Sequence, residues 1–546
     1  MTLRPAAEVS HTTRRPIGWS TLTTSARLFD LLESAIEREV RNGHWREAAG
    51  LSAVATRFAA RCHPGRFVSL PIERSLASIG HQLESANAAG SETATVPEPA
   101  GRGEGSPTER VLHVITRPEV PGGHTNWLKR WVVSDRSRVH SMVVVDPAGC
   151  TVPPDLRELF KQGGGDVIEL AGPADDLIGR AGALRAVTWG YDFVVLASHP
   201  HDIVPTLALS GPIGRPPVLT LNHSDHLFWV GAGISDVLVE FRGIGASWSR
   251  NHRGYPLQRQ IHVPLPVEQA VPMNRSQARR ELGLEDDAFV VVSVGSPYKY
   301  EPIDGLGFLQ VMSEGLHRIP SMLLLVVGPS DDGEWAATGR SLRGRVRAVG
   351  PQLALAPYFA AADAYVNSYP VGSTLALLDA AAAGLPVVSI LPKASDRSLI
   401  GDDPACPEGL LAVGDSAELA KTLAELREDP ELRQSRRDTA REHIERVHAG
   451  EGWRRNVEAA YAAAASAGPM SPQELGHSAG PSDVDDILSR LGSHTPCRTL
   501  LGCAVTDRAA LAPALRFALA VPEQALRVRT TLRTQGARLG VRGRSS

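Results

Sequence analysis

A lysine that follows a strongly apolar run has the type and position of a ligand-binding residue. The chain has only five lysines among its 57 basic residues, and Lys299 lies in segment 295–302, directly after the β-branched run 289–294. An ammonium group at the end of a buried strand can bind a diphosphate as a compact point charge. Lys299 is therefore a candidate ligand for the phosphates of a nucleotide.

A second polar loop precedes an alanine- and leucine-rich segment typical of a helix. Gly372, Ser373 and Thr374 open this segment, and Asp379 follows inside it. Amides and hydroxyls at a helix start can bind phosphate, and a carboxylate further along could reach ribose hydroxyls. The same residues also form an ordinary N-cap that requires no ligand. Both interpretations stay open for this loop.

The first half of the chain has a glycine-rich loop in the corresponding place. Gly122 and Gly123 follow the apolar run 111–116 and precede His124. Glycine lets the backbone approach a ligand closely and adopt positive φ, so His124 would stand at a helix start and face that ligand. A simple glycine-rich turn before a helix would have the same sequence, and the motif alone does not decide between the two.

A cluster of ionisable residues follows the predicted strand 218–221. Three ionisable groups and a tryptophan at a strand end are typical of a catalytic or acceptor-binding surface. These residues are His223, Asp225, His226 and Trp229.

Other interpretations of the histidines remain. A metal site is less favoured, because both histidines would need the same face of the loop and a further ligand. The histidines could instead cap strand ends, and His199 and His201, at the end of another predicted strand, share this ambiguity. Trp229 and Trp248 could stack on a sugar or fill the face of the domain.

Short β-branched runs alternate with helical segments over most of the chain. This alternation is typical of parallel, doubly wound sheets, and it occurs twice, on either side of a proline-containing stretch. We therefore predict an α/β fold with two tandem Rossmann-like domains, residues 110–267 and 273–465, that face a cleft. The helical tract 416–465 is expected to close the second domain. Ligands of such folds bind at the carboxyl ends of the strands.

Three further segments flank these domains. Amphipathic sequence predicts a small helical domain over 1–85, and segment 86–109, rich in Gly, Pro, Ser and Thr, predicts a linker. Residues 469–546 form an arginine-rich tail that we expect to be partly disordered. Because no aromatic residues are interleaved with its arginines, a solvated tail is favoured over a polyanion contact.

The overall composition excludes several classes of protein. A hydrophobic fraction of 42% excludes a mainly disordered chain, and a net charge of -3 gives no global attraction to nucleic acid or anionic lipid. The five cysteines have neither disulfide-framework nor zinc-site spacing. Because no apolar segment of signal-peptide or transmembrane length occurs, we expect a cytoplasmic protein that binds no nucleic acid. The sequence leaves its oligomeric state open.

The motifs of the second half together resemble the nucleotide-sugar domain of GT-B glycosyltransferases. The resemblance covers 110–465 and is most specific over 289–390. One branch, the retaining family typified by sucrose and glycogen synthases, has a Glu-x7-Glu signature. Here Asp379 falls at the second acid, but Val371 occupies the first position, and Ser296 stands where an arginine usually accompanies the lysine.

Protein O-GlcNAc transferases and bacterial cytoplasmic N-glycosyltransferases are similar in other details. Their Tyr-Lys-x-Asp-Pro stretch is similar to 298–302, their Gly-His-Thr-Thr loop to 372–374, and their Gly-Asn-His to 122–124. The resemblance implies that one group of residues binds the donor and that one residue lies near the reacting centre. The implied donor ligands are Gly122, Gly123, Lys299, Gly372, Ser373, Thr374 and Asp379, with His124 near the reacting centre.

The resemblance implies a sugar transfer from a nucleoside diphosphate sugar, such as a UDP-sugar, to an acceptor in the first domain. No cofactor and no resident metal are implied. Lys299 and the loop amides would stabilise the leaving diphosphate. If the reaction inverts, His124 or Asp225 would be the base, and the departures from Glu-x7-Glu favour inversion.

Alternatives to a transferase remain at this stage. An epimerase or hydrolase could use the same scaffold without an acceptor, and a nonenzymatic scaffold protein could use the helical segment and tail to recruit partners. The Lys299 loop and the Gly-Ser-Thr loop argue against the scaffold protein. The bias toward arginine and alanine hints at a GC-rich genome and at a small-molecule, natural-product or cell-envelope acceptor.

Overall fold

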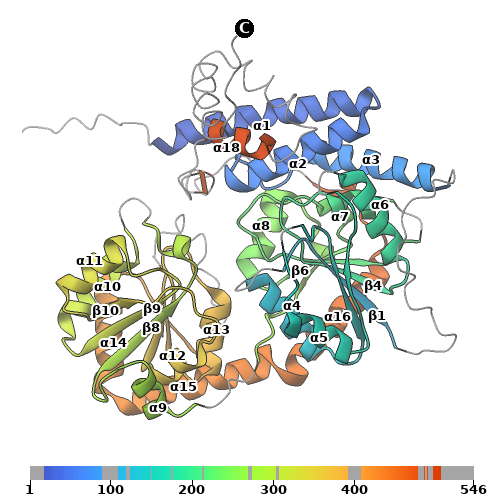
Figure 1. Cartoon of the computed structure of the whole chain (residues 1–546). Coiled ribbons are helices and arrows are strands. Elements are labelled where there is room, and N and C mark those ends of the chain that lie inside the picture. The colour runs from blue at the N-terminus through green and yellow to red at the C-terminus, as the bar shows by residue number, and fades with distance from the viewer. Residues whose placement is uncertain are drawn as a thin grey trace, which may run out of the picture.

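The computed structural model contains two parallel sheets, each covered by helices, and a helical layer above the first sheet (Figure 1). Gly122 and most of the predicted linker and tail lie outside the described residues. The structure describes residues 17–88, 108–118, 123–148, 150–173, 176–211, 214–268, 273–302, 306–391, 408–476, 485, 488–489 and 496–505.

The first sheet has seven parallel strands in the order β3-β2-β1-β4-β5-β6-β7. Most of its strand residues are buried, as a sheet covered on both faces requires. The strands are β1 (Arg110–Ile115), β2 (Val139–Val144), β3 (Val167–Glu169), β4 (Phe193–Leu196), β5 (Val218–Leu221), β6 (Val237–Glu240) and β7 (Gln260–His262). The helices are α4 (Gly123–Ser134), α5 (Pro154–Gln162), α6 (Leu177–Thr188), α7 (Val204–Leu209) and α8 (Gly243–Arg253), with short turns η1 (Ala232–Ile234) and η2 (Leu257–Arg259).

The second sheet has six parallel strands in the order β10-β9-β8-β11-β12-β13. The strands are β8 (Phe289–Val294), β9 (Met322–Val327), β10 (Val346–Ala348), β11 (Ala364–Val366), β12 (Val387–Ile390) and β13 (Leu410–Val413). The helices are α9 (Arg275–Glu281), α10 (Phe308–Arg318), α11 (Gly333–Ser341), α12 (Ala356–Ala361), α13 (Thr374–Ala382), α14 (Ser416–Glu428) and α15 (Pro430–His443), with the short turn η3 (Pro297–Tyr300). The predicted fold class, two Rossmann-like domains in the GT-B arrangement after a helical region, is confirmed.

The helical layer shares a core with the first sheet. Helices α1 (Ile17–Arg41), α2 (Trp45–Arg61) and α3 (Leu70–Ala88) bury side chains such as Phe29 in the same cluster as Leu112 and Val194 of that sheet. Helix α18 (Pro496–Val505) packs on α1 and α2. These ten residues of the predicted tail therefore belong to the helical layer, because α18 has an apolar side that the layer buries.

The chain crosses between the sheets twice, and the two crossings are bonded to each other. The first crossing includes Pro264 and Val267, and the second runs through the π-helical turn η4 (Ile444–His448) into α16 (Gly450–Ala467). The amide of Val267 donates to the carbonyl of His448 at 2.9 Å, and the indole of Trp453 donates to the carbonyl of Pro264 at 2.8 Å.

The last long helix does not close the second domain as expected. Helix α16 packs against β5 and β6 of the first sheet (Figure 1), where Trp453 meets Trp131 with ring centroids 5.5 Å apart. The difference arises because an amphipathic pattern predicts an apolar face but does not say which sheet that face covers. The turn η5 (Pro472–Glu474) follows and also packs beside the first sheet, against η1.

Replacing Trp453 tests how much this crossing contributes to stability. The Trp453→Ala variant should lose about 3–5 kcal/mol of unfolding free energy, because a fully buried indole leaves a cavity and an unpaired carbonyl. Urea denaturation measures the loss. Trp189→Ala is the matched control, since the Trp189 side chain is 53% exposed, and similar losses in both variants would contradict the role of Trp453.

Candidate active site

The strand order places four loops where ligands bind in open α/β sheets. Each order reverses once, between β1 and β4 in the first sheet and between β8 and β11 in the second. Ligands of such sheets lie outside the carboxyl ends of the strands at this reversal. The loops there carry His124 and His199 in the first domain and Lys299 and Ser373 in the second, as the sequence predicts.

Three histidines from different loops gather in the first domain. The ring centroid of His124, at the start of α4, lies 5.7 Å from that of His199 and 5.9 Å from that of His223. The backbone carbonyl of Arg117 lies 3.2 Å from Nε2 of His124, and the carbonyl of Leu221 lies 3.1 Å from Nδ1 of His223. The fold therefore brings together two predicted site residues, His124 and His223.

Burial keeps part of this histidine group neutral. It lowers the pKa of His223 to about 3, and the charge of His124 contributes in the same direction. Burial also lowers the pKa of His201 to about 3. The nearby charges of His199, Arg57, Arg61 and Arg117 lower it further. A neutral imidazole can accept a hydrogen bond from a hydroxyl group, but with a pKa this low it takes up a proton poorly.

Asp225 is not available as the predicted catalytic base. Its buried carboxylate accepts hydrogen bonds from both Nε, at 3.0 Å, and Nη2 of Arg242. Although burial alone would raise the pKa of Asp225, the guanidinium and His226 hold it well below its usual range. A carboxylate held this way binds a proton poorly, so we interpret Asp225 as the anchor of Arg242.

The remaining acceptor candidates separate into different places. His226 contacts Asp225, with Nδ1 and Oδ1 3.3 Å apart. Trp229 is buried beneath the cation of Arg253, which lies 5.0 Å from its ring centroid. Trp248 packs against Phe67 of the helical layer, so it fills the domain face.

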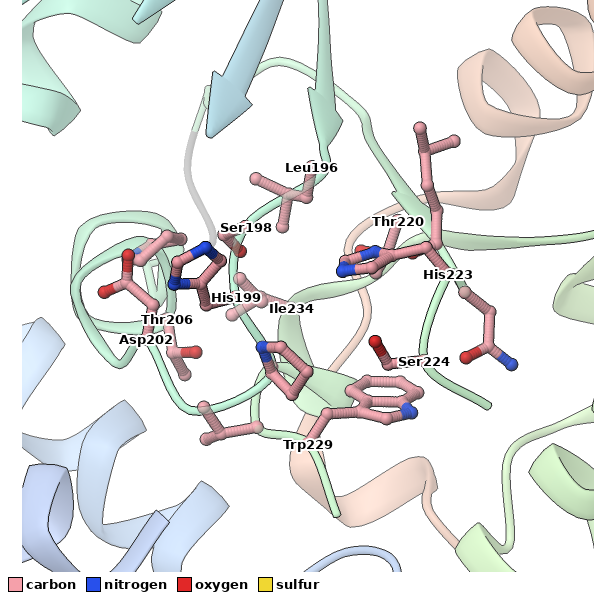
Figure 2. Close-up of a pocket in the computed structure, with 16 residues that line it drawn as sticks. Leu196, Ser198, His199, Asp202, Thr206, Thr220, His223, Ser224, Trp229 and Ile234 are labelled. Carbon is pink, nitrogen blue, oxygen red and sulfur yellow. The ribbon is translucent and has the colours of Figure 1, made fainter. Parts of the chain in front are cut away.

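A small pocket opens at the carboxyl ends of β4 and β5 (Figure 2). Figure 2 shows His199 and His223 on two sides of the pocket, with Trp229 and Ser224 beneath them in this view. Leu196 and Ile234 add apolar lining. Half of the residues that line the pocket are polar, among them His199, Asp202 and His223, whereas His226 does not line it.

In the second domain, Lys299 joins the two predicted phosphate loops. Its Nζ donates to the carbonyl of Gly372 at 3.1 Å. Burial lowers the pKa of Lys299 to about 8, with the charge of Arg242 from the first domain as the next cause. Arg242 of the first domain is therefore close enough to Lys299 of the second domain to lower its pKa.

The start of α13 is built differently from the prediction. The amide of Ser373 donates to Oδ1 of Asn367 at 2.9 Å, and the hydroxyl of Ser373 lies 2.9 Å from that of Ser368. Ser373 is therefore occupied in holding the loop. Thr374 begins the helix, and the amides of its first turn have no intrahelical acceptor.

Asp379, the predicted ribose ligand, is paired with the other domain. Both oxygens of its carboxylate contact the guanidinium of Arg130 on α4, each at 2.8 Å. A ribose hydroxyl that binds Asp379 would therefore share this carboxylate with Arg130.

A second buried carboxylate, which the sequence analysis missed, lies beneath the Asn222 loop. Glu240 ends β6 and accepts a hydrogen bond of 2.8 Å from the amide group of Asn222. Burial raises the pKa of Glu240 to about 7, and the charge of Asp225 adds to this. Arg253, also buried, donates to the carbonyls of Asp225 and Leu227. The sequence offers one indication of this residue, because Glu240 ends a predicted strand.

The polar side chains of the described site loops do not gather into a metal-binding cluster. Within the described ranges, no group of three or more His, Cys, Asp or Glu side chains could hold a metal ion. His223 turns toward His124, whereas His226 pairs with Asp225, so the His-x-Asp-His sequence does not converge on one point.

Part of the chain matches a known protein family, and the fold is similar to solved structures. Residues 288–429 match the family model of "Glycosyl transferases group 1", and no curated protein sequence gives a significant match. HepE from Anabaena, solved with UDP and glucose, is 15% identical with a TM-score of 0.51, over 65% of this chain and 99% of that one.

Other solved glycosyltransferases are also similar. One from Rickettsia africae is 12% identical with a TM-score of 0.50, over 66% of this chain and 99% of that one. A mutant O-GlcNAc transferase from Thermobaculum terrenum is 15% identical with a TM-score of 0.46, over 82% of this chain and 84% of that one.

The group 1 match over residues 288–429 and the fold shared with solved glycosyltransferases support a resemblance of the chain to GT-B glycosyltransferases. The predicted enzyme class and the predicted resemblance are thereby confirmed. In the part of the chain that the structure describes, no helix is both long and apolar enough to cross a membrane.

Glu240 should make the stability of the protein depend on pH. Its pKa is about 7 in the fold against an ordinary 4.5, so between these values the native state binds more protons than the unfolded state. This stabilisation is complete below the ordinary value and is lost as the pH rises through the folded value, by about 3 kcal/mol in total.

Glu240→Gln should remove this dependence, because glutamine does not titrate. Urea denaturation across the range from about pH 4 to pH 8 measures it, and Glu442→Gln, at an exposed position, should behave as the wild type. An unchanged pH profile in Glu240→Gln would show that Glu240 is ionised throughout.

Proposed function

We propose that the protein transfers a sugar from a nucleoside diphosphate sugar, of the UDP type, to an acceptor in the pocket of the first domain. The observation that carries the proposal is Lys299, which stands at the carboxyl end of β8 and contacts the loop that opens α13. Both elements lie inside the group 1 match. The similar HepE structure contains UDP and glucose, which supports this choice of donor.

The leaving diphosphate gains negative charge when the glycosidic bond breaks. Lys299 and the first-turn amides of α13 would stabilise that charge from the second domain. Arg242 would add positive potential from the first domain, although its guanidinium is anchored to Asp225. Positively charged groups fixed before the reaction need little reorganisation when the charge develops.

The acceptor hydroxyl or amine needs a proton acceptor if the transfer inverts configuration. His124 is our candidate base, because it stands at the start of α4 beside the pocket residues His199 and His223. Asp225 is withdrawn from this role because of its ion pair with Arg242. We also propose that the acceptor is a small molecule or an envelope glycan, that the protein is cytoplasmic, and that the transfer needs no resident metal.

Replacing Lys299 tests the phosphate role. Lys299→Ala should lower donor turnover by roughly 100- to 1,000-fold, since it removes a preorganised positive charge from the leaving group. Lys421→Ala is the control, because that lysine lies exposed on α14, remote from the site loops. Product formation from UDP-glucose and circular dichroism of both variants are measured, and full turnover in Lys299→Ala would refute the role.

Arg130 should compete with the nucleotide for Asp379. Arg130→Ala frees the carboxylate and should tighten UDP binding by about two- to five-fold, the value of a partly exposed ion pair, whereas Asp379→Ala should weaken it. Isothermal calorimetry measures both, with Arg136→Ala on the nearby surface as control. If Arg130→Ala weakened binding, Arg130 itself would be a nucleotide ligand.

The donor class can be tested directly with UDP, GDP, ADP and TDP. Selective binding by the wild type that is lost in Lys299→Ala supports a nucleotide-sugar transferase and names the base. Binding of none of the four would contradict the proposal. Sugar release from a bound donor without any acceptor product would favour a hydrolase on the same fold.

A further inference from the structure

A glutamate of the helical layer holds a wall of the acceptor pocket. Glu73, on α3, is only 1% exposed. Its Oε1 accepts hydrogen bonds from the amides of Gly231 and Ala232 at 2.7 and 3.1 Å, and its Oε2 accepts one from Gly233 at 3.0 Å. Three consecutive backbone amides therefore point at one buried carboxylate from another part of the chain.

The bonded segment belongs to the pocket. Gly231 and Ile234 line it, together with Trp229 and Val230 just before them. Gly231 has a φ of 107°, a conformation that side chains disfavour and that turns the chain into η1. The carboxylate satisfies the amides at the start of this turn, so the path of the pocket wall depends on Glu73.

Two more bonds from the helical layer reach the same pocket. The hydroxyl of Thr56 on α2 donates to the carbonyl of His201 at 2.9 Å, in the loop after β4. The amide of Trp229 donates to the carbonyl of Phe67 at 3.3 Å, in the loop after β5. The layer thus contacts both loops that form the pocket.

The geometry points to Glu73 as a positioning residue for acceptor binding, through which the helical layer sets the shape of the pocket. The acceptor assignment rests on the proposed function. The donor loops that carry Lys299 and Thr374 lie in the second domain, away from Glu73, so Glu73 should act on the pocket and leave nucleotide binding unchanged.

Glu73→Gln is the test variant, because it keeps the size of the side chain. Glutamine offers one acceptor oxygen and turns an NH2 group toward amides that also donate, so at least one amide loses its partner. Glu33→Gln is the matched control. Glu33 is a buried carboxylate of the same layer, but it binds Ser69 and Arg66 and not the pocket loop.

Hydrogen exchange of the amides 231–233 and modification of His199 and His223 by diethyl pyrocarbonate report on the pocket. Both should speed up by about ten-fold or more in Glu73→Gln, the effect of losing a hydrogen bond to a charged group. The reaction of the exposed His317 should not change, and Glu33→Gln should match the wild type at all these positions.

UDP binding, measured by calorimetry on the full chain, separates this inference from the proposed function. Glu73→Gln should bind UDP within two-fold of the wild type. Wild-type rates at the pocket in Glu73→Gln, or equal acceleration in Glu33→Gln, would overturn the positioning role. Failure of the wild type to bind any nucleotide would instead overturn the proposed function, whatever the pocket rates are.

Discussion

The bonds between the two chain crossings are the constraint on which the rest of the structure depends. Each parallel sheet presents its ligand loops at one edge only, so a shared site requires the two edges to face each other. Trp453 and His448 fasten the return crossing to the outgoing one at Pro264, Leu265 and Val267. Because α16 then packs on the first sheet, the C-terminal helices cannot turn without disturbing both sheets.

Charge is distributed unevenly across the cleft that results. The second domain contributes the cation Lys299, and Arg242 adds another from the first domain, where Asp225 fixes its direction. On the acceptor side, burial leaves His223 neutral near physiological pH. Positive charge where a diphosphate would leave, and a neutral imidazole that can accept a hydrogen bond from an acceptor hydroxyl, suit group transfer better than simple binding.

The sequence predicts the sheets, and the place of the candidate site loops at their carboxyl ends, because both follow from local patterns. Strand ends identify Lys299, His124 and His223, since parallel strands bring their carboxyl ends to one edge. Pairing between distant segments is not predictable in this way. Asp379 meets Arg130 from 249 positions away, and no local signal at either residue indicates it. The prediction that helix α16 closes the second domain is wrong for the same reason.

The helical layer shows how such distant pairing can carry function. A separate helical domain would pack only on itself. Here Phe29 of the helical layer packs on Phe228 of the pocket loop, with ring centroids 5.3 Å apart. A buried carboxylate is costly unless it is fully hydrogen-bonded, and Glu73 meets this condition only because η1 supplies three amides. The layer and the loop therefore stabilise each other. A change in either one alters the pocket wall that contains Trp229 and Ile234, so under the proposed function acceptor choice can vary without any change in the donor domain.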